Sequence, residues 1–288
     1  MAKIIDGKKI AGEALARAAH EAAALRKKTG KTPCLAIISV GEDSSSKIYM
    51  KKKTQACDYC GFKHLLVELP ARATQDELLR AIEKLNEAPG VNGLIVQLPL
   101  PRHLNANEAT AAVSPEKDVD GFTPCNIGKL FSSDASAFIP ATAKGVMFLI
   151  DKTGVKLQGA NAVVVGKGLI TGKPIALLLA NANATVTMCD KYTKDLAGVA
   201  KRADVLVSAT GVAGLVKKNF VKKGAVVIDV GITRRADGKI VGDVAFDEVS
   251  KALGASGALT PVPGGVGPMT VAMLIENTLE AFKRQNGI

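Results

Sequence analysis

Apolar and polar residues follow two patterns along the chain, one typical of buried strands and one typical of helices. Cys34–Val40 and Gly93–Gln97 are short apolar runs, each ended by a glycine or a proline. Ala11–Lys28 and Ser44–Cys60 are longer, and charged residues are spread through them as in helices. Continuous apolar runs are typical of strands buried on both faces of a parallel sheet. The alternation therefore predicts an α/β fold with helices on both faces of a parallel sheet.

The pattern also indicates two domains. Thr74–Glu87 opens with Thr74-Gln75-Asp76-Glu77, a capping box that predicts a helix start. The remaining strands are expected at Lys63–Leu69, Asn161–Val165, Ala184–Met188, Asp204–Ser208 and Ala225–Val230. Between Asp118 and Ala141 the periodicity fades, and Thr260–Pro268 is a Pro/Gly-rich loop. We expect one domain of residues 1–140 plus a terminal helix in 269–288, and a second domain of residues 141–268.

The charge is strongly basic but does not identify a partner. Lys and Arg number 38 against 27 Asp and Glu, a net charge of +11, which raises nucleic acid as a ligand. Tryptophan is absent and aromatic residues make up 4% of the chain, so stacking platforms for single strands are scarce. The lysines are dispersed, and the densest run is Lys51-Lys52-Lys53. A basic surface attracts a phosphorylated small molecule equally well, and we expect no nucleic-acid partner.

The N-terminus and the cysteines bear on the compartment. No apolar run reaches the roughly 18 residues that span a bilayer, and charges interrupt the apolar stretches of the first 30 residues. Five cysteines without an export signal fit reduced thiols. We expect a cytoplasmic protein that does not associate with membranes.

A glycine-rich loop follows the apolar strand that ends at Val165. Its glycines are Gly166, Gly168 and Gly172, with Lys167 between the first two. Glycines between a strand and a helix let the backbone approach a pyrophosphate at the helix N-terminus. The third glycine lies one position later than in the usual Gly-x-Gly-x-x-Gly, and a tight turn without a ligand is the alternative interpretation.

The residues that close the next strand bear on the choice of dinucleotide. They are Cys189-Asp190-Lys191. An acidic residue there commonly accepts from the ribose 2′-hydroxyl of NAD, whereas nearby cations suit the 2′-phosphate of NADP. Lys167 and Lys191 favour NADP, and Asp190 keeps NAD possible. Because two lysines outnumber one aspartate, we expect NADP.

A second candidate site lies on the helix predicted over Ser44–Cys60. Ser46, Tyr49 and Lys53 share one helical face. A lysine in a desolvated pocket becomes an acid/base group near neutral pH, but Lys51 and Lys52 beside it suggest an ordinary solvated run. Cys57 and Cys60 lack a second ligand pair, and the three histidines have no ligand spacing, so no metal site is expected.

Four ordered stretches together resemble the bifunctional methylenetetrahydrofolate dehydrogenase/cyclohydrolase family. They extend from the N-terminal third of the chain almost to its end, and their order is that of the family. The stretches are Val40–Lys53 (VGEDSSSKIYMKKK), Gly93–Pro101 (GLIVQLPLP), Lys117–Phe122 (KDVDGF) and Thr260–Thr270 (TPVPGGVGPMT).

The resemblance implies a role for each candidate position. Lys53 matches the catalytic lysine, Gln97 its partner, Tyr49 the tyrosine packed against the folate ring, and Asp120 the carboxylate that binds the pterin. The family's substrate cleft lies between the domains, and the substrate-binding set is completed by Ser46, Pro263, Gly264 and Gly265. The implied cofactor positions are Gly166, Lys167, Gly168, Gly172, Lys191, Gly211 and Ile232.

The activity implied by the resemblance has two steps. 5,10-Methylenetetrahydrofolate is oxidised to the methenyl cation, and water then opens that cation to 10-formyltetrahydrofolate in one-carbon metabolism. The family also implies a homodimer joined through the dinucleotide domain, and polyglutamylated folates as substrates would suit the +11 charge.

The chain departs from the family pattern at three places. Pro140–Gly145 (PATAKG) replaces Pro-Cys-Thr-Pro-x-Gly, Gly166-Lys167-Gly168 replaces Gly-Arg-Ser, and Cys189-Asp190-Lys191 replaces Cys-His-Ser. The last two departures lie where the protein contacts the 2′ position of the adenosine ribose and distinguishes NAD from NADP. A different nicotinamide-dependent dehydrogenase and a basic nucleic-acid-binding protein are the alternative functions.

Overall fold

The computed structural model describes residues 1–41 and 44–288, and the side chains of residues 44–46 are left out of the description. The chain forms two compact units. Unit 1 contains Met1–Ala11 and Thr142–Thr270, and unit 2 contains Gly12–Ala141 and Val271–Ile288. Each unit is built on its own parallel sheet.

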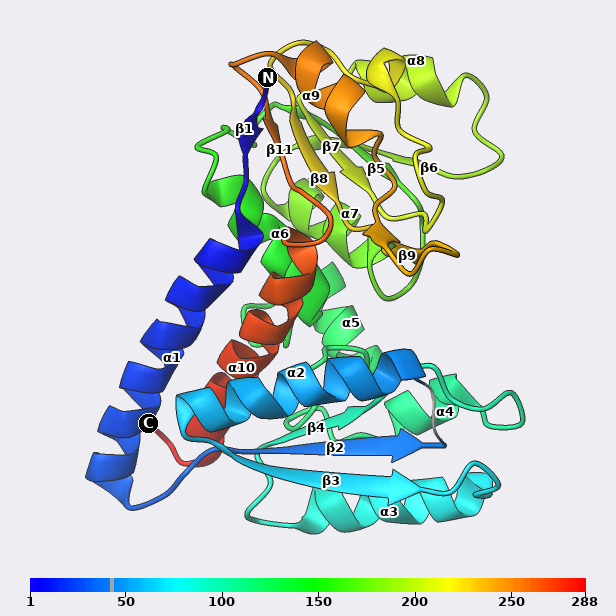
Figure 1. Cartoon of the computed structure of the whole chain (residues 1–288). Coiled ribbons are helices and arrows are strands. Elements are labelled where there is room, and N and C mark those ends of the chain that lie inside the picture. Colours follow the sequence, from blue (N-terminus) through cyan, green and yellow to red (C-terminus); the bar gives the residue numbers. More distant parts are fainter. Residues whose placement is uncertain (42–43) are drawn as a thin grey trace. The chain divides into compact units, whose positions relative to one another are not determined.

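Unit 2 is centred on a three-stranded sheet in the order β3 (Lys63–Leu69), β2 (Cys34–Val40), β4 (Gly93–Val96). Every residue of β2 is buried, as expected for a central strand covered on both faces. Helix α3 (Gln75–Glu87) buries Leu78, Ile82 and Leu85 against one face, in a cluster that also holds residues of α4 (Ala106–Ala111). Helix α2 (Ser44–Cys60) lies over the other face (Figure 1).

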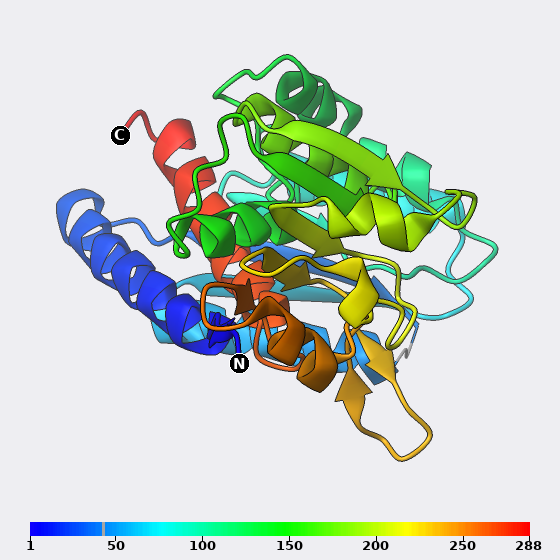
Figure 2. The same ribbon diagram turned by 90° about the horizontal axis from the view of Figure 1, so that it is seen from above.

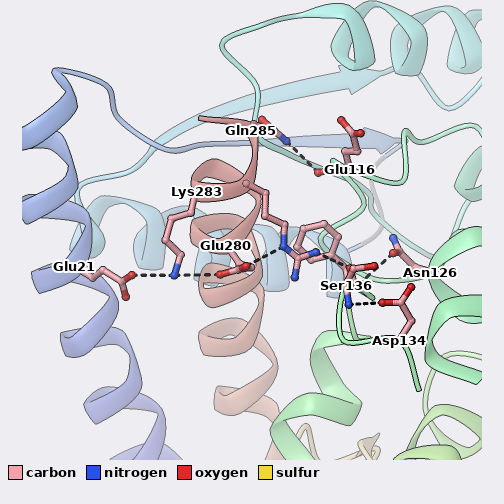
Figure 3. Close-up of polar contacts among 10 residues, drawn as sticks. Glu21, Glu116, Asn126, Asp134, Ser136, Glu280, Lys283 and Gln285 are labelled. Atoms are coloured by element: carbon pink, nitrogen blue, oxygen red, sulfur yellow. Dashed lines mark hydrogen bonds and ion pairs between the residues drawn. The ribbon is translucent and has the colours of Figure 1, made fainter. Parts of the chain in front are cut away.

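The C-terminal part of α10 (Val266–Gln285) is attached to the rest of unit 2 by polar side chains (Figure 3). Lys283 lies between Glu21 of α1 (Gly7–Thr29) and Glu280, with N–O distances of 3.0 and 3.1 Å. Arg284 donates to the carbonyl of Ser136 at 2.6 Å, and its guanidinium lies 4.6 Å from the centroid of the Phe138 ring. These contacts bring the end of the chain against the segment that precedes α6 (Ala141–Asp151).

Unit 1 is built on six parallel strands. Their order is β1 (Lys3–Ile4), β11 (Ala258–Leu259), β8 (Val226–Asp229), β7 (Val205–Ser208), β5 (Asn161–Val165), β6 (Thr185–Cys189). Strands β6 and β7 lie on opposite sides of β5, so the direction in which strands are added reverses there. In open α/β sheets, ligands bind at the carboxyl ends of the strands beside such a switch point.

Helices cover both faces of this sheet. Helices α8 (Leu196–Lys201) and α9 (Phe246–Leu253) and the short 3₁₀ helix Lys218–Phe220 pack on an apolar cluster that includes Leu206 and Val227. Helix α7 (Gly172–Asn181) packs against β5 and β6. The antiparallel pair β9 (Thr233–Arg234) and β10 (Ile240–Val241) forms a ribbon that extends away from the sheet (Figure 2).

The predicted α/β class is confirmed, and β2, α2, β3 and β5 have the expected bounds. The expected assignment of residues 1–140 to one domain needs correction at its start, since Lys3 and Ile4 pair with Ala258 and Leu259 and place Met1–Ala11 in unit 1.

Two helices differ from the expected pattern. The terminal helix begins at Val266, not at Met269, because Pro268 is tolerated in a first helical turn. Helix α5 (Pro124–Phe131) lies in the segment without periodicity, and it starts with the Thr123 cap and with Pro124 in its first turn. In the described part of the chain, no helix combines the length and apolarity that crossing a membrane requires.

Candidate functional site

Lys53 differs from its neighbours on α2 by being buried. Its exposed fraction is 8%, whereas Lys51 and Lys52 are exposed. The Lys53 Nζ donates to Gln97 Oε1 at 3.0 Å. Gln97 follows β4, and its backbone N–H donates to Ile38 of β2 at 2.8 Å, so the sheet fixes its position. The Gln97 Nε2 donates to the Leu98 carbonyl at 2.7 Å, which leaves Oε1 as the acceptor that faces the lysine.

Burial shifts the pKa values of Lys53 and Asp120 in opposite directions. It lowers the pKa of Lys53, while the nearby Asp120 opposes that shift. Burial raises the pKa of Asp120, Lys53 opposes that shift, and Asp118 adds to it. The two groups are thus close enough to affect each other's charge. A buried lysine with a nearby carboxyl is an arrangement suited to moving a proton near neutral pH.

Asp118 fixes the turn that carries Asp120. Its carboxylate accepts from the backbone N–H groups of Phe122 and Thr123 at 3.1 and 2.8 Å, and from Asn126 Nδ2 at 2.9 Å. Asp118 therefore holds the segment that leads into α5 and accepts three hydrogen bonds. Gly121 has φ +71° and no space for a side chain, because a Cβ there would collide with Phe138 and Pro140. Asp118 therefore has a structural role, and Asp120 is the aspartate of this turn that is a candidate for binding substrate.

Tyr49 lies one helical turn before Lys53. It is half-buried, burial raises its pKa, and the Lys52 ammonium lies 5.7 Å from the centroid of its ring. The predicted Ser46 side chain lies outside the described residues. Unit 2 therefore brings together Lys53, Gln97 and Asp120, with Tyr49 on the same helix as the lysine. We call these four residues the Lys53 cluster.

The predicted glycine loop of unit 1 joins β5 to α7. Gly166 has φ +106°, and a Cβ there would collide with the Ala209 carbonyl. A Cβ on Gly172 would collide with the backbone of Gly166, whereas the nearest atom to a Cβ on Gly168 is 3.8 Å away. The turn is therefore too tight for side chains at its two ends. This cradle, at the carboxyl end of β5 and the N-terminus of α7, fits a dinucleotide pyrophosphate.

Lys167 and Asp190 form an ion pair with an N–O distance of 2.6 Å. Their hydrogen bond raises the pKa of Lys167 and lowers that of Asp190. Asp190 also accepts from the Tyr192 N–H at 2.9 Å. The exposed Lys191 ammonium lies 5.0 Å from the centroid of the Tyr192 ring. The two side chains that favour different dinucleotides are thus in contact with each other.

The other predicted positions of unit 1 are on loops at the carboxyl ends of strands. Gly211 has φ +69° after β7, and its carbonyl accepts from Thr233 Oγ1 at 3.1 Å. Ile232 follows β8 and is 48% exposed. In the Pro263-Gly264-Gly265 loop, a Cβ on Gly265 would lie 2.6 Å from the Pro261 carbonyl, and the Gly264 carbonyl accepts from the Lys8 N–H at 2.8 Å.

The buried acids Asp229 and Asp243 are not singled out in the sequence, where the signal that marks them is an adjacent glycine-containing turn. Asp118, also buried, is named there only as part of the Lys117–Phe122 stretch. Cys57 and Cys60 are buried free thiols whose pKa burial raises to about 12 and about 11. Among the residues that the structure describes, no three His, Cys, Asp or Glu side chains are grouped as metal ligands would be.

Comparison with known proteins gives consistent matches over nearly the whole chain. The model described as "Tetrahydrofolate dehydrogenase/cyclohydrolase, catalytic domain" matches residues 5–120, and that described as the NAD(P)-binding domain of the same enzymes matches residues 140–286. The bifunctional protein FolD of Listeria innocua is 49% identical over 284 residues, which cover 99% of this chain and 98% of the relative.

Solved structures agree with these sequence matches. The bifunctional FolD methylenetetrahydrofolate dehydrogenase/cyclohydrolase of Campylobacter jejuni has a TM-score of 0.95 and 43% identity, with 99% of both chains covered. The Trypanosoma brucei enzyme, solved with NADP and an inhibitor, has a TM-score of 0.94 and 41% identity, with 100% of this chain and 99% of that chain covered.

Proposed function

The chain belongs to the tetrahydrofolate dehydrogenase/cyclohydrolase family, and from this premise we propose which side chains perform each of its two reactions. The enzyme oxidises 5,10-methylenetetrahydrofolate to 5,10-methenyltetrahydrofolate with NADP⁺, and then hydrolyses the methenyl group to give 10-formyltetrahydrofolate. The single observation that carries the assignment of residues is the buried Lys53, hydrogen-bonded to Gln97 and electrostatically coupled to Asp120.

Lys53 acts in the hydrolytic step. Water attacks the cationic methenyl carbon, forms a C–O bond and gives up one proton. The C–N5 bond then breaks as the remaining hydroxyl proton is transferred to N5, which leaves the formyl group on N10. Burial lowers the pKa of Lys53, which favours the neutral amine that can take the proton from the attacking water. Gln97 keeps the amine in place, because its own amide is fixed by the Leu98 carbonyl and by β2.

Asp120 and Tyr49 hold the folate. A carboxylate accepts paired hydrogen bonds from a pterin ring N–H and its exocyclic amine, which gives the contact a fixed geometry. Asp118 and α5 hold the turn that presents Asp120. The half-buried Tyr49 ring supplies a flat apolar face for the ring system. Ser46 and the loop Pro263-Gly264-Gly265 complete the proposed substrate contacts.

The glycine cradle between β5 and α7 holds the NADP pyrophosphate, and Gly211, Ile232, Lys167 and Lys191 complete the proposed cofactor contacts. When bound, NADP⁺ supplies the acceptor for the hydride of the methylene group. Support comes from the tight turn, in which a Cβ at Gly166 or Gly172 would collide with backbone, whereas the nearest atom to a Cβ on Gly168 is 3.8 Å away. The protein's part in this step is orientation.

Three further proposals concern partners and location. We propose that the net charge of +11 attracts the glutamate tail of polyglutamylated folates, and that two copies of the chain join as a homodimer through unit 1. The free thiols of all five cysteines suit a reducing cytoplasm. Nucleic acid is not proposed as a partner, and a gel-shift assay across salt concentrations would reveal it.

Lys53→Met tests the assignment of the hydrolytic step. We expect its cyclohydrolase rate to fall by about 10²- to 10⁴-fold, the usual contribution of a positioned acid/base group. Reduced cofactor should still form, and the methenyl product should accumulate in the ultraviolet spectrum. Lys51→Met is the matched control, because it removes an exposed lysine from the same helix. Hydrolysis of methenyl substrate by Lys53→Met at the rate of the control would show that the assignment is wrong.

A further inference from the structure

Two carboxyl groups are buried next to each other in unit 1. Asp229 ends β8 and is 3% exposed, and Asp243 follows β10 and is fully buried. The Asp243 N–H donates to Asp229 Oδ1 at 3.0 Å. Within residues 1–41 and 44–288, no lysine or arginine forms an ion pair with either group. Buried acids without a cation are costly to maintain, so their retention calls for a physical reason.

Asp243 fixes the loop that follows β7. Its Oδ2 accepts from Ser208 Oγ at 2.9 Å, from the Thr210 N–H at 2.7 Å and from Thr210 Oγ1 at 2.8 Å. Thr210 Oγ1 in turn accepts from the Val212 N–H at 3.1 Å. One carboxylate oxygen thus determines the course of residues 210–212, and Gly211 is the middle residue of that loop.

Asp229 fixes the loop that follows β8. Its Oδ1 accepts from the Gly231 N–H at 2.9 Å, and its Oδ2 accepts from the Val244 N–H at 2.9 Å. Its own N–H donates to Thr260 Oγ1 at 2.8 Å, which joins β8 to the start of the segment after β11. Ile232 follows Gly231 directly, so the carboxylate sets the position of its backbone.

The packing around the pair leaves no space. A Cβ on Gly231 would collide with the Asp243 carboxylate, and a Cβ on Gly242 would collide with the Asp229 carboxylate. Asp243 Oδ1 is buried and has no hydrogen-bond partner among the residues that the structure describes. Unsatisfied buried oxygens are rare in proteins. The Asp243 carboxylate thus leaves Oδ1 without a hydrogen bond, while its Oδ2 accepts hydrogen bonds from three donors of a single segment.

We propose that Asp243 is a positioning residue of the dinucleotide site and that, together with Asp229, it holds the loops 210–212 and 231–233 at their working separation. The proposal rests on the proposed cofactor roles of Gly211 and Ile232, which lie in these loops. Strand β7 ends beside the switch point at which α/β sheets bind dinucleotides, and β8 pairs with β7. Neither carboxylate touches the cofactor in this role, since each acts through backbone that it holds.

Asp243→Ala and Asp243→Asn, compared with the natural chain, test the proposal. Alanine leaves three donors unsatisfied, so we expect the Kd for NADP⁺ to rise about tenfold or more, with the KM for NADP⁺ rising while the KM for the folate is unchanged. Asparagine retains an acceptor oxygen, and we expect it to restore binding to within about threefold. Asp247→Asn, an exposed carboxylate on α9, is the matched control.

A second pair of variants keeps the test decisive if Asp243→Ala does not fold. Thr210→Val removes one hydroxyl that donates to Asp243, whereas Thr210→Ser retains it. We expect Thr210→Val to bind NADP⁺ several-fold more weakly than Thr210→Ser. Equal Kd values for these two variants, or binding by Asp243→Ala within twofold of the natural chain, would overturn the positioning role.

The same titrations separate this proposal from the proposed function. If the natural chain itself neither binds nor reduces NADP⁺, the proposed function fails. If the natural chain binds NADP⁺ and the Asp243 variants bind it equally well, only the positioning role fails. Cyclohydrolase activity on methenyl substrate, measured for every variant, reports separately on the Lys53 cluster.

Discussion

A single buried amine distinguishes Lys53 from the two lysines that precede it. The three residues are consecutive and chemically identical, so apart from the resemblance to the family their order in the sequence gives no reason to choose one of them. Helical geometry turns successive side chains by about 100°, and only Lys53 is buried and reaches Gln97. The sequence could place the lysine run on a helix, but the burial that changes its chemistry depends on contacts with β4 and with the Asp120 turn.

One contact changes the argument by which the sequence favours NADP over NAD. From the sequence, Lys167 and Lys191 counted as two free cations and Asp190 as one opposing anion. In the structure Lys167 is paired with Asp190, so that lysine must exchange partners before it can contact a 2′-phosphate. Counting charges along the sequence could not reveal this, because the two residues are 23 positions apart and meet only when β5 and β6 pair.

Asp190→Ser should increase the preference for NADP⁺. The substitution frees Lys167 and removes a negative charge next to the 2′-phosphate position, and it also removes an acceptor for the ribose 2′-hydroxyl of NAD⁺. We expect the ratio of kcat/KM for NADP⁺ to that for NAD⁺ to rise by about fivefold to tenfold, within the range of a charged hydrogen bond. Lys167→Met should change the ratio in the opposite direction. An unchanged ratio in Asp190→Ser would show that the Lys167–Asp190 ion pair does not distinguish the 2′-phosphate from the 2′-hydroxyl of the ribose.

Among the elements, those with strong local signals were predictable. Strand β2 is a seven-residue apolar run, and all seven of its residues are buried. The capping box at Thr74 is present as the sequence indicated, with Glu77 N–H donating to Thr74 Oγ1 at 3.2 Å and Thr74 N–H donating to Glu77 Oε2 at 2.8 Å. Strands β1 and β11 have two residues each and owe their conformation to pairing with distant strands, so no local pattern could reveal them.

Thr74→Ala should weaken α3. The substitution removes the acceptor for the Glu77 N–H, and loss of such a cap costs about 1 kcal/mol of unfolding free energy. The midpoint of urea denaturation should fall for Thr74→Ala and stay close to the natural value for Thr74→Ser, which retains the hydroxyl. Equal midpoints for the two variants would exclude a stabilising role for this cap.

For the molecule as a whole, Asp229 makes stability depend on pH. Burial raises the pKa of this carboxyl from 3.8 to about 6, and the neighbouring Asp243 contributes to the shift. Between these values the folded protein holds a proton that the unfolded chain has released, so stability from this group increases as the pH falls from about 6 to 4. The difference between these two pKa values corresponds to about 3 kcal/mol of unfolding free energy at most.

Asp229→Asn isolates this contribution. The free energy of unfolding of the natural chain minus that of the variant should become larger as the pH is lowered from about 7 to 4, because asparagine does not titrate. Carboxylates that do not contact Asp229, such as Asp204 with its Lys222 partner, are in the same surroundings in both proteins, so their contributions cancel in the difference. A difference that stays constant with pH would contradict the raised pKa.

The two units are each assembled from two separate stretches of chain, and this affects how the protein is made on the ribosome. Strand β1 is synthesised about 250 residues before its partner β11. Unit 2 starts at Gly12 and needs Val271–Ile288, which is synthesised after the whole of unit 1. Domains that fold during synthesis are usually complete before the next one appears. Here unit 1 is incomplete until Thr270 has been made, and unit 2 is incomplete until Val271–Ile288 has followed. Chains released by ribosomes that stall before β11 should therefore be substrates for chaperones and proteases rather than partly active enzymes.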